Sequence, residues 1–426
     1  MSGIRGKAVV AQSGGPTAVI NASAGGAIET ALANGSTFSA VYGAHNGILG
    51  VLREELFDLG KEDPRQIKLL SRSPSAALGS CRYKLKSLEA SRADYERILE
   101  VFRAHDVRFF FYIGGNDSMD TADKLVRLAA ETGYEMVVVG VPKTIDNDLA
   151  YTDHCPGYGS VAKYTATTAM EAGRDTESLY THDTTTVMEV MGRNAGWIAA
   201  SAGLARRSPE DAPHLIYLPE VPFSKEQFVA DDKACMAEFG RCFIVAGEGI
   251  RDADGNHIAE VGGSFAKDAF GHTQLGGAGQ TLRMVVESEV GVKCRYNNAG
   301  TSQRNARHFA SAADVAEAHM AGVAAVEAAM AGATSKMVSL VRQDDGGRYR
   351  CTTGLVDLVD VANAEKPVPR EYINEAGNGV TEAFLDYARP LIAGIAELEM
   401  GADGLPIYAR LARHWVEKKT GRDYRT

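Results

Sequence analysis

Two apolar, β-prone runs in this chain each end directly in a short loop of glycine and charged residues. Residues 107–113 lead into Gly-Gly-Asn-Asp-Ser at 114–118, and residues 136–141 lead into Pro-Lys-Thr-Ile-Asp-Asn-Asp at 142–148. If the runs are neighbouring parallel strands, both loops lie at the carboxyl edge of a sheet, where open α/β sheets bind ligands. Three carboxylates, a lysine and two glycines on one rim suit the metal-assisted transfer of a phosphoryl group.

The rest of the chain repeats this alternation of apolar runs with helical patterns, which is typical of mostly parallel sheets covered on both faces. Because 426 residues exceed one ordinary core and no linker is evident, we predict two domains that share the chain by crossing back. Asp117 or Ser118 should cap the helix that follows the first loop. We expect strands also at 8–12, 184–190, 214–218 and 242–246, and helices at 21–32, 118–131, 164–180 and 311–333.

The composition argues against several classes of protein. The 55 acidic and 45 basic side chains give a net charge of −10, which disfavours a nucleic-acid partner. No apolar stretch approaches a membrane span, and the apolar run near the start is too short for a signal-peptide core. The six cysteines are scattered without a Cys-x-x-Cys pair, as in proteins with reduced thiols. We therefore expect a cytoplasmic protein with no membrane and no nucleic-acid partner.

The glycine loops leave two interpretations open. Gly14 and Gly15, after the expected strand at 8–12, could make a tight turn only or present backbone amides to a phosphate. No Gly-Lys-Ser/Thr follows, so this is not a Walker A sequence. The loop at 114–118 is more specific, because an acidic residue stands at the positive end of a helix, but an Asx-capped helix is its plain alternative.

The loop at 142–148 offers a lysine and two carboxylates. In an extended segment, Asp146 and Asp148 would project to the same side, so that one holds Mg²⁺ while the other accepts a proton from an attacking hydroxyl. Lys143 adds a mobile positive charge for phosphate oxygens. The plain alternative is a surface loop that carries an ion pair.

Six stretches, in order along the chain, resemble the motifs of the 6-phosphofructokinase family and, within it, of the pyrophosphate-dependent branch. They are Ser-Gly-Gly at 13–15, Leu-Gly-Ser-Cys-Arg at 78–82, the loops at 114–118 and 142–148, Glu-Val-Met-Gly-Arg-Asn-Ala-Gly at 189–196, and Gly-Thr-Ser-Gln-Arg at 300–304. The resemblance covers roughly residues 7–335. It implies a phosphofructokinase-like α/β fold of two interleaved doubly wound domains with mostly parallel sheets.

On the donor side, the resemblance implies that Gly14, Gly15 and Gly115 line the phosphoryl-donor site and that Arg82 reaches the transferring group. Lys143 belongs to the same site.

Two departures from the ATP-using members concern the donor. Those members have glycine at the positions of Asp117 and Lys143. A carboxylate at Asp117 places bulk and negative charge where the α-phosphate of ATP would pass. The ammonium of Lys143 can neutralise pyrophosphate and the charge that develops during transfer. Both residues count among the predicted catalytic set, and the predicted donor is inorganic pyrophosphate.

The acceptor implied by the resemblance is fructose 6-phosphate. Asp146 would deprotonate the sugar 1-hydroxyl. Arg295 and Arg304 fall where family members hold the 6-phosphate, which a guanidinium can bind through bidentate contacts. The other implied sugar contacts are Thr144, Ile145, Met191, Gly192, Arg193, Glu248 and Thr301.

The predicted metal site is unusual for the family that the chain resembles. Asn116 stands where many members have an aspartate that helps to bind Mg²⁺, so the ion would rely on Asp148, on Asn116 or Asp117, and on the donor itself. A second stretch, at 271–277, resembles the family's His-x-Gln-Arg-Gly-Gly motif without its arginine. We assign the motif to 301–304, because the alanine-rich helix follows there, although Thr301 replaces the family's histidine.

The resemblance thus implies a reversible, Mg²⁺-dependent transfer from pyrophosphate to fructose 6-phosphate by a homodimer or homotetramer. Residues 1–158 with 304–345 would form the donor domain, 159–303 the sugar-phosphate domain, and 346–426 a segment that packs on both. Three alternatives remain open: an ATP-dependent 6-phosphofructokinase, additional activity on sedoheptulose 7-phosphate, and a regulatory subunit that binds sugar phosphates without catalysis.

Overall fold

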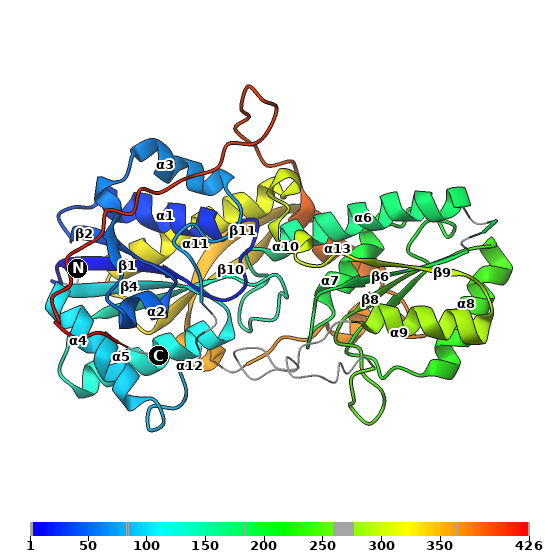
Figure 1. Cartoon of the computed structure of the whole chain (residues 1–426), viewed down its shortest axis with the longest axis horizontal. Helices are drawn as coiled ribbons and strands as arrows, with labels where there is room; N and C mark the ends of the chain where they lie inside the picture. The colour runs from blue at the N-terminus through cyan, green and yellow to red at the C-terminus, as the bar shows by residue number, and fades with distance from the viewer. Residues whose placement is uncertain are drawn as a thin grey trace.

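The computed structural model describes residues 3–81, 83, 85–179, 181–182, 184–258, 277–362 and 364–424, which form two α/β lobes side by side (Figure 1). The first lobe contains a seven-stranded sheet in the order β11-β10-β5-β4-β1-β2-β3, in which β2–β3 and β10–β11 are antiparallel and the other pairs parallel. Its strands are β1 (Gly6–Gln12), β2 (Phe38–Ala44), β3 (Leu56–Asp58), β4 (Val107–Gly114), β5 (Val137–Pro142), β10 (Lys336–Asp345) and β11 (Arg348–Asp357).

The second lobe contains a four-stranded sheet in the order β7-β8-β6-β9, and all of its pairs are parallel. Its strands are β6 (Thr185–Val190), β7 (Leu215–Tyr217), β8 (Cys242–Gly247) and β9 (Cys294–Asn298). The predicted α/β architecture with mostly parallel sheets is therefore confirmed.

Helices bury both faces of the first sheet, which explains why β4 is apolar along almost its whole length. Phe109 and Phe111 point toward α1 (Ile20–Ala33) and α11 (Ala312–Met330). The intervening residues of the strand belong to the opposite core, against α4 (Arg92–His105) and α5 (Asn116–Glu131). A strand that is buried on both faces must be apolar at successive positions.

The second sheet is covered in the same way. One face packs against α6 (Tyr158–Leu179), α7 (Trp197–Ser201) and α13 (Glu382–Ala388), and the other against α8 (Lys225–Phe239) and α9 (Ala278–Val285). The remaining α-helices are short: α2 (Ile48–Leu52), α3 (Pro64–Leu69), α10 (Ser302–Asn305) and α12 (Leu358–Val361).

Two topological switch points determine where a ligand can bind. In the first sheet the chain runs outward from β1 to β2 on one side and from β4 to β5 on the other, so the loops after β1 and β4 flank a crevice. In the second sheet, β6 lies between β8 and β9, and the loops after β6 and β8 flank a second crevice. Ligands of open α/β sheets bind at such crevices, outside the carboxyl ends of the strands.

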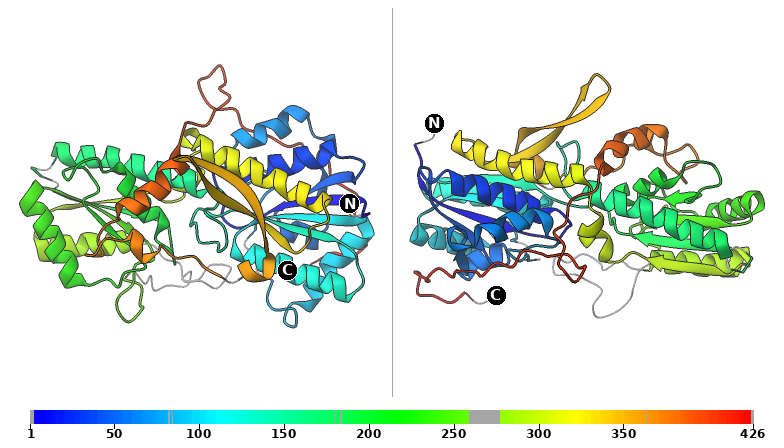
Figure 2. Two further views of the ribbon diagram at one scale, coloured as in Figure 1. Left: turned by 180° about the vertical axis from the view of Figure 1, so that it is seen from behind. Right: turned by 90° about the horizontal axis from the view of Figure 1, so that it is seen from above.

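Residues 346–424 are spread over both lobes (Figure 2). β11 pairs with β10 in the first sheet, whereas α13 packs on the second lobe. We define residues 409–424 as the C-terminal strap, which runs along the first lobe. Trp415 forms a β-bridge with Phe57 of β3 within this strap.

The prediction that Asp117 or Ser118 caps α5 was wrong. α5 begins at Asn116, and its N-cap is Gly115, which makes no side-chain hydrogen bond. Ser118 lies in the first turn, and its hydroxyl pairs with that of Ser13 across the crevice. Asp117 likewise lies in the first turn, so its carboxylate sits beside the positive end of the helix.

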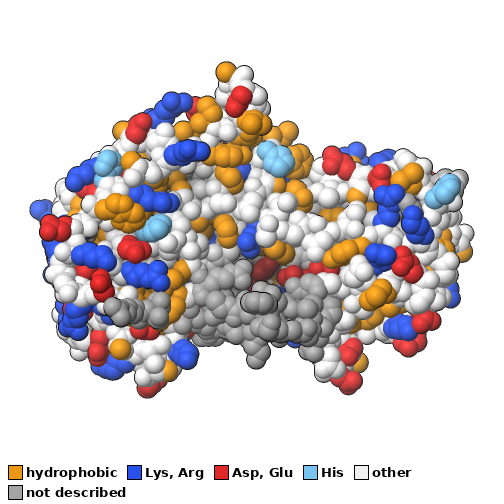
Figure 3. All heavy atoms as spheres, in the orientation of Figure 1, with side chains coloured by type: hydrophobic (Ala, Val, Ile, Leu, Met, Phe, Trp, Pro, Cys, Tyr) orange, Lys and Arg blue, Asp and Glu red, His pale blue; other side chains and the backbone are white. Residues whose placement is uncertain are grey.

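The surface carries charges of both signs on the face shown in Figure 3, over both lobes. None of the helices described here has the length and apolar character needed to cross a bilayer.

Candidate active site

A cavity of about 660 Å³ lies at the carboxyl ends of strands from both sheets. Its first-lobe wall comes from the loops after β1, β4 and β5, and its second-lobe wall from the loops after β6 and β8. The predicted site residues that line it are Gly14, Gly15, Gly115, Asn116, Asp117, Lys143, Thr144, Ile145, Asp146, Asp148, Met191, Arg193, Glu248, Thr301 and Arg304.

Two cationic side chains from other segments, Lys143 and Arg304, lie against the loop after β1. Gly14 has a φ of +73°, which favours glycine, and a Cβ there would lie 3.0 Å from the Nζ of Lys143. A Cβ on Gly15 would lie 3.3 Å from a terminal nitrogen of Arg304. The Lys143 Nζ also donates a 2.9 Å hydrogen bond to the carbonyl of Gly15. The paired glycines thus let an ammonium and a guanidinium approach the same backbone.

The N-terminus of α5 forms the adjacent part of the wall. Its first residue, Asn116, has a buried Oδ1 that finds no hydrogen-bond partner in the described part of the chain. A buried carbonyl-type oxygen without a donor is a candidate ligand for a cation. Asp117 follows it on the cavity wall.

The turn that carries the two carboxylates differs from the prediction. The segment is not extended, because Asn147 adopts a φ of +56° between Asp146 and Asp148. Asparagine tolerates this left-handed conformation better than most residues. The Asp146 amide donates a 3.1 Å hydrogen bond to the Thr144 hydroxyl. Both carboxylates still line the cavity, but a tight turn brings them there instead of strand alternation.

Burial dominates the electrostatics of this turn. Burial and then the nearby Glu248 carboxylate raise the pKa of Asp146, against the opposing effects of Lys143 and Arg193. Burial and then Asp146 raise the pKa of Asp148. A carboxyl group with a raised pKa is a stronger base when ionised, which suits general-base catalysis near neutral pH.

The second-lobe wall holds a further carboxyl group. Burial raises the pKa of Glu248 to about 7, although Arg193 opposes the effect. The backbone amide of Met191 is held by a 3.0 Å hydrogen bond to the side chain of Gln303, which is buried. Gly192 lies between Met191 and Arg193 without lining the cavity itself.

Arg295, one of the predicted sugar-phosphate contacts, stands apart from the cavity. Arg295 lies on the edge strand β9, where its guanidinium is 3.8 Å from Asp175 and its side chain is 45% exposed. It does not line the cavity of its own chain. Arg82 and the look-alike stretch at 271–276 fall outside the described residues.

Sequence reasoning missed several residues of the site. Gln303 was not predicted as a site residue, although it lies between Thr301 and Arg304 in the motif. Tyr83 and Asn194, on opposite sides of the cavity, were missed as well. Glu365 comes from the C-terminal segment and accepts a 2.9 Å hydrogen bond from Asn194. No periodicity or motif around Glu365 indicates that this residue lines the cavity.

The cavity thus brings together buried carboxyl groups, a lysine, arginines and a buried amide oxygen. These parts suffice for an in-line phosphoryl transfer to a hydroxyl group. A model of the phosphofructokinase family matches residues 7–329. The chain belongs to the phosphofructokinase family. The phosphofructokinase-like fold predicted from the sequence is thereby confirmed.

Similar phosphofructokinases span nearly the whole chain. A pyrophosphate–fructose 6-phosphate 1-phosphotransferase of Xanthomonas campestris pv. campestris (strain B100) is 49% identical over 97% of this chain and 98% of its own length. One of Halomonas elongata is 46% identical over 97% of both chains. The crystal structure of the pyrophosphate-dependent phosphofructokinase from Marinobacter aquaeolei is 44% identical, with a TM-score of 0.89 over 99% of this chain and 100% of that one.

Part of the cavity wall lies beyond the matched family region. Glu365 lines the cavity although the match ends at residue 329. The segment that carries it is anchored beside the carboxylates, because the Lys366 amide donates a 2.7 Å hydrogen bond to the carbonyl of Asp148. The C-terminal segment therefore contributes directly to the cavity.

Proposed function

We propose that this chain transfers a phosphoryl group from inorganic pyrophosphate to the 1-hydroxyl of fructose 6-phosphate. The products are fructose 1,6-bisphosphate and phosphate, and the reaction is reversible and Mg²⁺-dependent. One observation carries the proposal: Asp117 and Lys143 line the same cavity as the base Asp146. The names of the relatives that share 46–49% of their residues with the chain support the same reaction.

The donor pyrophosphate lies between the loop after β1 and the N-terminus of α5. Gly14, Gly15 and Gly115 line this side of the cavity and expose backbone to it. The first-turn amides and the positive end of α5 favour an anion there. Lys143 is only 3% exposed, so its charge acts with little screening by water.

In the proposed transfer, the Asp146 carboxylate accepts the proton of the sugar 1-hydroxyl. The sugar oxygen forms a bond to the transferring phosphorus while the bridging P–O bond of pyrophosphate breaks, and phosphate leaves. Lys143 stabilises charge on the phosphate oxygens, and we assign the same role to Arg82. Asp117 restricts the donor site, because its carboxylate disfavours a further phosphate at that position.

The residues present fit a Mg²⁺ ion. Asp148 and the partnerless Oδ1 of Asn116 both line the cavity, and oxygen atoms are the ligands this cation takes. When bound, the ion neutralises phosphate charge and polarises the transferring group. Asp146, which is not assigned to the metal, therefore remains available to accept the proton of the sugar 1-hydroxyl.

The sugar phosphate lies against the second lobe in this proposal. Met191, Arg193 and Glu248 bind the sugar, with Gly192 shaping the turn between the first two, and Arg304 binds its phosphate. Thr144, Ile145 and Thr301 complete the predicted contacts.

Arg295 requires a different arrangement, because it does not line the cavity of its own chain and lies beside Asp175. We propose a cytoplasmic homodimer or homotetramer in which this arginine reaches the sugar phosphate of a neighbouring subunit. In this assignment, the donor domain comprises residues 1–158 with 304–345, and the sugar domain comprises 159–303.

The test is a product assay with the purified chain, fructose 6-phosphate, Mg²⁺ and either pyrophosphate or ATP. We expect fructose 1,6-bisphosphate with pyrophosphate and at least about 100-fold less turnover with ATP. Comparable rates with both donors would favour an ATP-dependent enzyme. Binding of fructose 6-phosphate without turnover would favour a regulatory subunit, and sedoheptulose 7-phosphate in place of fructose 6-phosphate tests the acceptor.

A further inference from the structure

We propose that Tyr387, outside the matched family region, positions the acid–base turn through Asn147. The inference rests on the proposed function only in taking Asp146 and Asp148 as the working carboxylates. Asn147 stands between them, is fully buried and has a φ of +56°. Its conformation therefore determines the relative direction of the two flanking side chains.

The Asn147 side chain is held at both ends. Its Oδ1 accepts a 2.9 Å hydrogen bond from the amide of Cys155, and its Nδ2 donates a 2.9 Å hydrogen bond to the hydroxyl of Tyr387. The same hydroxyl donates to the carbonyl of Asp153 at 2.8 Å. The hydroxyl proton is thus engaged elsewhere, which leaves an oxygen lone pair for Asn147 and fixes the orientation of the amide.

Tyr387 is itself fixed by an arginine. The guanidinium of Arg342, on β10, lies 4.7 Å from the centre of the Tyr387 ring and donates a 2.9 Å hydrogen bond to the Tyr387 carbonyl. It also pairs with the Asp153 carboxylate at 3.0 Å. The Tyr387 ring also packs against Trp197, with the ring centres 5.3 Å apart.

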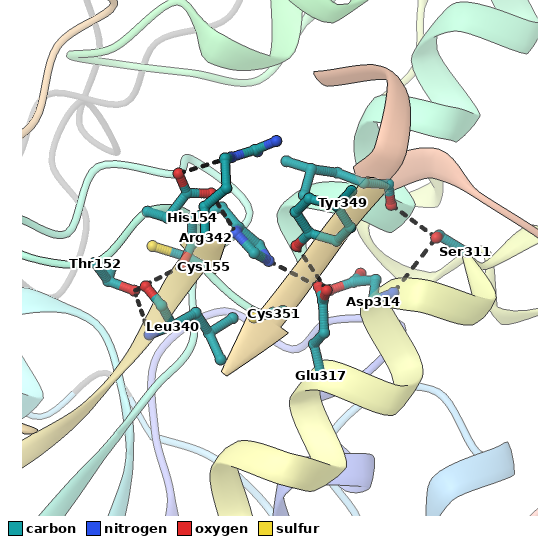
Figure 4. A network of polar contacts seen from close by, with 12 residues as sticks. Thr152, His154, Cys155, Ser311, Asp314, Glu317, Leu340, Arg342, Tyr349 and Cys351 are labelled. Carbon is teal, nitrogen blue, oxygen red and sulfur yellow. Dashed lines mark hydrogen bonds and ion pairs between the residues drawn. The ribbon is translucent and has the colours of Figure 1, made fainter. Parts of the chain in front are cut away.

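A buried ionic network supports this arrangement (Figure 4). His154 has no exposed surface and lies 2.8 Å from a carboxylate oxygen of Asp153 on one side and of Glu317 on the other. Tyr349, on β11, donates a 2.7 Å hydrogen bond to Glu317. The network thus joins α11, both strands of the β10–β11 hairpin and the loop that follows the acid–base turn. Each carboxylate in it has a cationic or hydroxyl partner, so the block has little freedom to shift.

Tyr387 is therefore a positioning residue, since it touches neither the cavity nor the reacting groups. The contact that matters spans 240 residues of sequence, from the turn to α13. It links the C-terminal segment to the direction of the base, a link that the matched region alone does not contain.

The test compares Tyr387→Phe with Tyr372→Phe. Tyr372 belongs to the same aromatic cluster, 5.6 Å from Tyr387, but its hydroxyl takes no part in the contacts above. We expect Tyr387→Phe to lower kcat by at least about tenfold while both KM values change by less than about threefold. Tyr372→Phe should retain the wild-type kcat. Equal kcat in the two variants would overturn the proposal.

A double-mutant cycle with Asn147→Gly tests the pathway. Glycine keeps the left-handed backbone without strain but removes both side-chain contacts. If Tyr387 acts through Asn147, adding Tyr387→Phe to Asn147→Gly causes no further loss of kcat. Losses that multiply, or an Asn147→Gly variant with wild-type kcat, would overturn the proposal.

Hydrogen exchange provides a readout that does not depend on turnover. We expect Tyr387→Phe, but not Tyr372→Phe, to speed amide exchange in a peptide that covers residues 144–155. Unchanged exchange would count against the proposal even if kcat fell. A different result would reject the donor assignment: a wild-type chain that shows no turnover with pyrophosphate. Failure of the donor assignment can therefore be distinguished from failure of the role of Tyr387.

Discussion

The ammonium of Lys143 donates a 2.9 Å hydrogen bond to the carbonyl of Gly15, which joins the end of β5 to the loop after β1. This contact carries a buried positive charge across the crevice between strands that are not neighbours in the sheet. In the proposed reaction, a donor phosphate that enters the crevice would meet a charge that is already in place.

Replacing both donor-side residues tests this relationship. We expect Asp117→Gly with Lys143→Gly to lower turnover with pyrophosphate by about 100-fold or more, because the buried cation is lost. The freed space should also raise the ratio of ATP to pyrophosphate turnover. The measurement is steady-state kinetics with each donor. Unchanged kinetics with pyrophosphate would contradict the donor argument.

Removal of the base should affect the chemical step. Asp146→Ser is expected to lower kcat by roughly 10²- to 10⁴-fold while the KM for fructose 6-phosphate changes little, since general-base catalysis contributes about that much. Single-turnover measurements separate chemistry from product release. A variant that lost binding and kept kcat would assign Asp146 to the sugar site alone.

The pH dependence of kcat/KM should follow the charges around Asp146. Burial and Glu248 raise the pKa of Asp146, and Lys143 lowers it. Because the base must be ionised, kcat/KM falls as pH drops through that raised pKa. Glu248→Gln removes a raising charge and should move the acidic limb to lower pH, whereas Lys143→Met should move it to higher pH. Shifts in the same direction would contradict this account.

Metal binding should respond to the charge at Asn116. We expect Asn116→Asp to bind Mn²⁺, a spectroscopic probe for Mg²⁺, roughly tenfold more tightly without donor, because affinity follows ligand charge. Asn298→Asp, outside the cavity, is the matched control. Electron paramagnetic resonance measures the free ion, and chelation of the metal should abolish turnover. Equal affinity in both variants would exclude Asn116 as a ligand.

The C-terminal strap gives a prediction for acid stability. Burial acts to raise the pKa of Glu54, but hydrogen bonds from Lys419, Thr420 and His105 outweigh it and lower the pKa from 4.5 to about 2. The ionised form is favoured in the folded state, so this stabilisation is complete above pH 4.5 and is lost as pH falls toward about 2.

The free energy of unfolding, measured against pH, checks this prediction. Glu54→Gln should be less stable at neutral pH and should lose less stability in the acid range than the wild-type chain. Glu96→Gln, in an exposed pair with Arg92, is the control and should match the wild-type curve. A parallel acid limb for Glu54→Gln would show that the strap is held by other contacts.

The first-lobe loop residues that line the cavity could be predicted from the sequence because the signal that marks them is local. A buried strand must be apolar, its carboxyl end must turn, and the polar residues in that turn point to a ligand. The same locality explains the errors. Ser118 resembled a cap, but its hydroxyl pairs with Ser13, more than 100 residues away. The turn at Asn147 looked extended because its left-handed conformation depends on Cys155 and Tyr387.

By itself, the sequence determined the strand-loop-helix units and the residues they carry at their carboxyl ends, because periodicity and turn chemistry act over short distances. Only the tertiary structure decided that the loops of both sheets line one cavity, that Arg295 does not line it, and that Glu365 does. These outcomes depend on strand order and on packing between distant segments. Contacts between distant segments leave no pattern in the residues next to them in sequence. They can therefore be identified only from burial and hydrogen bonds in the folded structure.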